Sequence, residues 1–63
     1  MTRTEATTIV SIILANPVPH VRTATVCGGV IAGEYSVALH FLDGDILAVA
    51  GTSDVLSYCY PDR

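Results

Sequence analysis

Residues 36–51 have the sequence SVALHFLDGDILAVAG, in which two apolar runs flank the dipeptide Asp43-Gly44. An Asp-Gly pair tolerates the positive φ that a tight β-turn requires, so this segment predicts a β-hairpin. Its strands are expected over residues 35–42 and 46–50. The hairpin makes an antiparallel sheet the centre of the fold and places two carboxylates, those of Asp43 and Asp45, at an exposed tip.

The length of the turn decides which face of the hairpin each side chain occupies. A two-residue turn pairs Phe41 with Ile46, Leu39 with Ala48 and Val37 with Ala50, and leaves Ala38, His40, Asp45, Leu47 and Val49 on the opposite face. A three-residue turn through Asp45 moves the register by one residue, and the sequence leaves both possibilities open. Both faces are largely apolar in either case, so we expect a helix to cover one and a partner the other.

The segment before the hairpin predicts a helix over residues 3–14. Its apolar side chains recur with the spacing of one helical face, at Ala6, Ile9, Val10, Ile13 and Leu14. Thr2 and Glu5 have the spacing of a capping box, and Asn16-Pro17 is typical of a helix end.

The remaining elements complete an α+β fold. Residues 21–26 are rich in Val and Thr and predict a strand, which Gly28-Gly29 ends. After Gly51, Thr52 or Ser53 is expected to cap a short helix with Asp54 in its first turn. We therefore expect one small domain over residues 1–63, with an N-terminal helix, a three- or four-stranded antiparallel sheet around the central hairpin, and a short C-terminal helix.

Composition indicates a protein that binds other proteins. The chain has 63 residues, of which 51% are hydrophobic and 14% charged. A domain of this size buries roughly 60% of its unfolded surface, which leaves apolar area for a homodimer interface or a docking face. The chain has six acidic residues, three arginines and no lysine, so it cannot build the basic patch that binds nucleic acid or an anionic membrane. A basic protein surface is its natural electrostatic partner.

No motif for catalysis or metal binding is recognisable. Among His20, Cys27, His40 and Cys59, no two residues lie closer than seven positions, whereas structural zinc sites supply ligands in close pairs. Asp43-Gly44-Asp45 lacks the rest of a calcium loop. A chain this short offers no deep cleft to shape a catalytic site. We therefore expect no cofactor, no metal and no enzymatic activity.

The two cysteines and the N-terminal segment indicate a cytoplasmic protein. We expect Cys27 and Cys59 to be buried, reduced thiols, although a single disulfide remains open. Arg3 precedes an apolar stretch, but Glu5 interrupts the basic region that a secretion signal requires. No apolar run approaches the ~18 residues of a membrane span.

Three tyrosines, Tyr35, Tyr58 and Tyr60, combine apolar area with a hydroxyl group, as interface hot spots often do. At least one of them is expected to pack at the edge of the core instead. The others are candidates for partner contact.

In its size, its lysine-free acidic stretch from Glu34 to Asp62 and its lack of a catalytic or metal motif, the chain resembles small virus-encoded inhibitors of the anti-CRISPR type. The resemblance implies a non-enzymatic inhibitor in the host cytoplasm. It would dock an acidic face on the basic nucleic-acid-binding surface of a CRISPR effector complex, where its carboxylates replace phosphates. The residues implied are Glu34, Asp43, Asp45 and Asp54. The alternative is a structural or scaffold protein that self-assembles through its apolar sheet face.

Overall fold

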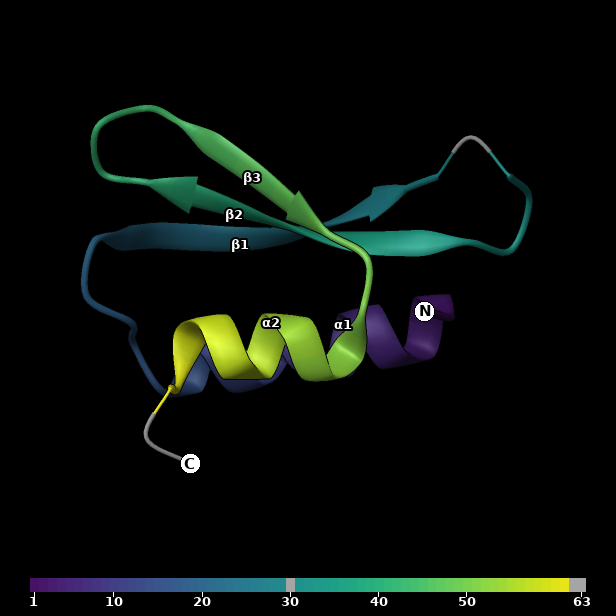
Figure 1. Cartoon of the computed structure of the whole chain (residues 1–63), viewed down its shortest axis with the longest axis horizontal. Helices are drawn as coiled ribbons and strands as arrows, with labels where there is room; N and C mark the ends of the chain where they lie inside the picture. The colour runs from purple at the N-terminus through teal and green to yellow at the C-terminus, as the bar shows by residue number, and fades with distance from the viewer. Residues whose placement is uncertain (30, 62–63) are drawn as a thin grey trace.

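The computed structural model describes residues 1–29 and 31–61 and has the element order α-β-β-β-α (Figure 1). Helix α1 spans Arg3–Ala15, and strands β1, β2 and β3 span Val21–Gly28, Tyr35–Phe41 and Ile46–Val49. Helix α2 spans Thr52–Cys59. The expected α+β fold is confirmed, with a three-stranded sheet.

Helix α1 forms where the sequence predicts it, and local chemistry fixes both of its ends. The Thr2 hydroxyl accepts a hydrogen bond from the Glu5 N–H at 3.1 Å, and the Glu5 carboxylate accepts one from the Thr2 N–H at 2.9 Å. These two bonds satisfy N–H groups that the first turn leaves without partners. The helix ends at Asn16, immediately before Pro17, because the residue preceding a proline is disfavoured in the helical conformation.

The sheet is an antiparallel meander in which β2 lies between β1 and β3. Strand β1 runs two residues further than its Val- and Thr-rich segment, and a bulge at Val21–Thr23 interrupts its pairing with β2. On the other side of β2, Leu39 pairs with Leu47 and His40 with Ile46. This register leaves a three-residue loop of residues 42–44, with Phe41 opposite Asp45. Both registers considered from the sequence, the two-residue turn and the three-residue turn through Asp45, are therefore wrong, although the second puts each residue of β3 on the observed face.

The shifted register changes the faces of β3. Leu47 and Val49 lie on the same face as Leu39 and Val37, and Ile46 and Ala48 share the opposite face with His40 and Ala38. Both helices lie on one side of the sheet, so the first set faces the helices and the second does not (Figure 1). Of the two β3 residues in the first set, Val49 packs against the core and Leu47 is exposed. We call the side away from the helices the open face.

The core lies between the helices and the covered face of the sheet. Its largest fully buried side chains are Val37 and Leu39 of β2 and Val55 of α2, and α1 contributes Ala6, Ile9 and Ile13. Fully burying one Val or Leu side chain contributes about 1.5–3 kcal/mol to folding. The central strand and the two helices therefore supply most of the stabilising burial.

Helix α2 begins differently from the prediction. Its N-cap is Gly51, which makes no side-chain capping bond, and Thr52 is already helical. A Cβ atom at position 51 would lie 2.6 Å from Asp54 Oδ2, so a larger residue here would require the Asp54 side chain to move. Asp54 does lie in the first turn, as expected, where its negative charge is favourable with the helix dipole.

Candidate partner-binding site

The β2–β3 hairpin ends in a loop of three residues, Leu42, Asp43 and Gly44. The Gly44 N–H donates to the Phe41 carbonyl at 3.1 Å, and the Phe41 N–H donates to the Asp45 carbonyl at 2.8 Å. Gly44 has a φ of 98°, which only glycine adopts without strain among ordinary residues. The Asp-Gly pair thus forms a tight turn as predicted, with the glycine as the last loop residue.

Both carboxylates of the tip are exposed to solvent. The Asp43 Oδ1 atom accepts a hydrogen bond from the Asp45 N–H at 2.9 Å, which fixes the orientation of the Asp43 side chain. Within residues 1–29 and 31–61, no ion pair involves either carboxylate. The tip therefore holds two negative charges in a defined loop, with oxygens available for a basic partner.

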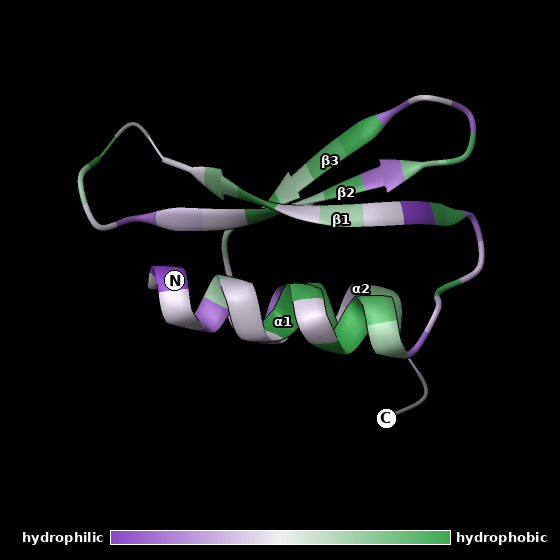
Figure 2. Cartoon of the chain, turned by 180° about the vertical axis from the view of Figure 1, so that it is seen from behind, coloured by the Kyte–Doolittle hydropathy of each residue, from purple (hydrophilic) through white to green (hydrophobic). Residues whose placement is uncertain are grey.

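Apolar side chains flank these carboxylates on both sides of the sheet, with Ile46 on the open face and Phe41 and Tyr58 on the side of the helices. Leu42 and Ile46 are 69% and 62% exposed. The ring of Phe41 lies 6.2 Å from that of Tyr58, centroid to centroid, and Tyr58 is itself 53% exposed. Figure 2 shows the hydrophobic strand β3 leading into a hydrophilic tip. We call Leu42, Asp43, Asp45, Ile46 and Tyr58 the tip patch.

A shallow pocket of about 250 Å³ lies beside the tip patch. It is lined by His20, Phe41, Leu42 and Asp43. The His20 carbonyl accepts a hydrogen bond from the Leu42 N–H at 3.0 Å, and His20 has a φ of 69°, which is uncommon for a residue other than glycine. The connector between α1 and β1 therefore supports the base of the tip.

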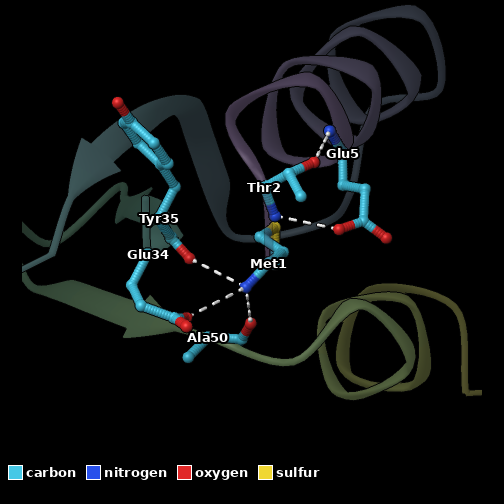
Figure 3. A network of polar contacts seen from close by, with 6 residues as sticks. All are labelled: Met1, Thr2, Glu5, Glu34, Tyr35 and Ala50. Atoms are coloured by element: carbon cyan, nitrogen blue, oxygen red, sulfur yellow. Dashed lines mark hydrogen bonds and ion pairs between the residues drawn. The ribbon is translucent and has the colours of Figure 1, made fainter. Parts of the chain in front are cut away.

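Glu34 lies at the opposite end of β2, in a different environment (Figure 3). Its Oε2 atom is 3.8 Å from the amino group of Met1, which also donates to the carbonyl oxygens of Tyr35 and Ala50 at 3.3 Å each. Seven strand residues separate Glu34 from the tip, a distance of about 20 Å. Glu34 thus belongs to a contact that joins the start of the chain to the sheet.

Asp54 is also apart from the tip. It lies in the first turn of α2, next to Gly51 and the segment that Met1 contacts. The four carboxylates expected to form one acidic face therefore divide into two groups, with Asp43 and Asp45 at one end of the sheet and Glu34 and Asp54 toward the other.

The three tyrosines have different surroundings. Tyr35 and Tyr60 are half-buried and pack against the core. The Tyr60 hydroxyl donates to the Asn16 carbonyl at 2.7 Å and so joins the end of α2 to the end of α1. Tyr58 is the exposed member of the set. The expectation that at least one tyrosine packs at the edge of the core is confirmed.

The cysteines lie on opposite sides of the sheet. Cys59 is buried in α2 against the core, and burial raises the pKa of its thiol. Cys27 is exposed in β1, so the expectation that both thiols are buried is wrong for Cys27. Its partner across the strand is Ser36, and no helix covers that face. Within the described residues both thiols are free, and no three His, Cys, Asp or Glu side chains come close enough to hold a metal ion.

The sequence analysis missed the apolar part of the tip patch. The sequence predicts Leu42 at the end of a strand and, for a two-residue turn, Ile46 opposite Phe41 in an apolar layer, whereas both residues are exposed in the structure. The sequence does contain a local signal for the position of Leu42. In a three-residue hairpin loop that ends at a glycine, the leucine directly before Asp-Gly is the first loop residue.

Comparison of the chain with protein-family models, with curated proteins and with solved structures found no match. Over residues 1–29 and 31–61, neither helix has the length and apolar character needed to cross a membrane.

Proposed function

We propose that this protein is a non-enzymatic binding module that inhibits its target by docking the tip patch on a basic, nucleic-acid-binding surface, such as that of a CRISPR effector complex. The observation that supports this is the β2–β3 loop, which presents the carboxylates of Asp43 and Asp45 between the exposed side chains of Leu42 and Ile46.

Charge and apolar contact have separate roles in such a site. Carboxylates on an exposed loop attract arginine and lysine and accelerate association, and a desolvated charge pair costs about 2–5 kcal/mol when one partner is removed. Leu42, Ile46 and Tyr58 supply area that excludes water from those pairs. The absence of lysine from the chain removes a source of repulsion toward a basic partner.

The proposed site is smaller than the one expected from sequence. It keeps Asp43, Asp45 and Tyr58 and does not include Glu34 or Asp54, which lie toward the other end of the sheet. Tyr35 and Tyr60 pack against the core and are also left out. Two carboxylates imitate only a short stretch of phosphate backbone, so recognition on this proposal depends equally on the apolar flank.

The test is a gel-shift assay in which CRISPR effector complexes of several types bind their target DNA in the presence of this protein. The parent chain is expected to prevent the shift for at least one complex, and Asp43→Lys/Asp45→Lys to lose that effect. Glu34→Lys is the matched control, because it reverses an exposed carboxylate outside the tip patch. If the double variant inhibits as well as the parent, or if no complex is inhibited, the proposal fails.

The alternative function, a structural protein that self-assembles, is favoured by the open face, where Ile46 and Ala48 are exposed. Light scattering over a concentration series separates the two. An inhibitor gives a discrete monomer or dimer, and a scaffold protein gives assemblies that grow with concentration.

A further inference from the structure

The pocket beside the tip patch is built from two segments of the chain that backbone hydrogen bonds hold together. We call it the tip pocket, and it is lined by His20, Phe41, Leu42 and Asp43. The Leu42 N–H donates to the His20 carbonyl at 3.0 Å, which joins the connector before β1 to the β2–β3 loop. The Phe41 N–H donates to the Asp45 carbonyl at 2.8 Å and closes that loop. The walls are therefore formed before a partner binds, which lowers the entropic cost of binding.

The volume of the tip pocket suits a single side chain. It is about 250 Å³, below the roughly 300–1,000 Å³ of sites that bury a whole drug-sized ligand. Three of its lining residues, His20, Leu42 and Asp43, are exposed, so the pocket is reached directly from solvent. A side chain that projects from the surface of another protein can therefore enter it.

Asp43 gives the tip pocket its negative charge, and its carboxylate has room for a cation. A carboxylate has about four lone-pair sites. Within residues 1–29 and 31–61, the Asp43 side chain uses one of them, for the Asp45 N–H at 2.9 Å, and takes part in no ion pair. Its two oxygens can therefore still accept two parallel N–H groups from one guanidinium.

Phe41 adds an aromatic wall to the tip pocket. Its ring packs against the core and lies 6.2 Å from that of Tyr58, centroid to centroid. The negative face of an aromatic ring attracts cations, and in proteins the cation is more often arginine than lysine. The guanidinium group is planar and weakly hydrated, whereas the lysine ammonium is compact and strongly hydrated. A pocket that combines a carboxylate with an aromatic ring and a leucine therefore fits arginine better than lysine.

We propose that the tip pocket receives one arginine side chain of the partner protein, with the guanidinium bound by the Asp43 carboxylate and the aliphatic stem against Phe41 and Leu42. This inference rests on the proposed function, because it names the group of the partner that the tip patch receives. It also gives the two carboxylates of the tip different roles. Asp43 lines the pocket, whereas Asp45 does not and attracts the partner from outside it.

Peptide titrations followed by NMR test the preference for arginine. The probes are four blocked tripeptides, acetyl-glycyl-X-glycyl amide, in which X is arginine, lysine, leucine or citrulline, the neutral analogue of arginine. The arginine peptide is expected to shift the Leu42 and Asp43 amide signals in a saturable way. It should bind about threefold more tightly than the lysine peptide, and the two neutral peptides should bind more weakly than either. Equal binding of the arginine and lysine peptides, equal binding of the arginine and citrulline peptides, or no saturable shift at these amides would overturn the inference.

A pair of isosteric variants tests the role of Asp43. Asp43→Asn removes the charge but keeps an oxygen for the Asp45 N–H, so the loop should keep its structure. This variant should bind the arginine peptide about tenfold more weakly, because a hydrogen bond to a charged group is lost. Asp45→Asn is the matched control and should weaken binding less than about threefold, as expected for a surface charge without direct contact. Equal losses in the two variants would contradict the assignment of Asp43.

A second pair of variants tests the aromatic wall. Phe41→Leu should abolish the preference for the arginine peptide over the lysine peptide, whereas Tyr58→Leu, which changes a ring outside the pocket, should keep it. The amide spectrum of each variant shows whether it is folded. A preference that survives in folded Phe41→Leu would contradict the aromatic wall.

The titrations use no effector complex, so the inference and the proposed function can fail separately. Inhibition in the gel-shift assay by a chain that does not prefer the arginine peptide would overturn the inference and leave the proposed function standing. Binding of the arginine peptide by a chain that inhibits no complex would support the arginine site and overturn the proposed function.

Discussion

The two faces of the sheet are built from neighbouring residues of one strand and have opposite environments. In β2, Val37 and Leu39 are fully buried under the helices, whereas Ser36 and His40, their neighbours in sequence, lie half-buried on the open face. The covered face carries large aliphatic side chains that fit between helix and sheet. Apart from Ile46, the open face carries mostly small or polar ones, and its His40 Nε2 lies 2.9 Å from Thr25 Oγ1. Stability therefore depends on one face, and the other remains available for contact.

Among the variants that test this difference between the faces, Leu39→Ala should lower the free energy of unfolding most. The side chain is 0% exposed, and truncating a buried leucine costs about 2–5 kcal/mol. His40→Ala, one residue further along, should cost about 1 kcal/mol or less because it loses only a polar contact at the surface. Urea unfolding of both variants measures the difference. Similar losses would show that the two faces contribute alike.

Gly44→Val should have the next largest effect, because the turn decides which face each residue of β3 occupies. Nothing lies within 4 Å of a Cβ placed at Gly44, so the penalty comes from the φ of 98° alone and should be about 1 kcal/mol or more. Leu42→Val is the control, because Leu42 is exposed and has no positive φ. Unfolding midpoints that are the same for both variants would argue against the observed turn.

The packing of the covered face also depends on α1, whose capping box includes the carboxylate of Glu5. The stability of the fold should therefore decrease in acid. Hydrogen bonds from Thr2 hold the pKa of Glu5 below its ordinary value. A carboxyl group with a lowered pKa in the folded state stabilises the fold above its unfolded pKa, and this contribution disappears as the pH falls through the folded pKa. Melting temperatures should therefore decline below about pH 5, and less so in Glu5→Gln. Parallel curves for parent and variant would exclude the capping box as the cause.

The reaction rates of the two cysteines compare the exposure of the two faces without any change in the stability of the fold. Cys27, exposed in β1, should react with a maleimide rapidly in the native protein, whereas Cys59 should react slowly because it is buried and its thiol pKa is raised. Mass spectrometry over time should show one fast and one slow addition, and Cys27→Ser should retain only the slow one. Two equally fast additions would mean that α2 does not protect the core.

The candidate site could be predicted only in part. The Asp-Gly turn and the exposure of Asp43 and Asp45 follow from local chemistry, because an Asp-Gly pair adopts a tight turn in almost any surroundings. The apolar flank of Leu42 and Ile46 depends on a difference of one residue in loop length, which reverses the face of every residue in β3. That choice agrees with the packing of Val49 against the core.

The sequence by itself determined the elements whose signals act over a few residues. These are the capping box at Thr2, the helix end before Pro17, the tight turn at Gly44 and the apolar central strand. Only the tertiary structure decided how distant residues are placed, because strand order and burial depend on contacts between segments far apart in the chain. It separated Glu34 from Asp43 by the length of β2, buried Cys59 while exposing Cys27, and placed the N-cap of α2 at Gly51, next to the side chain of Asp54.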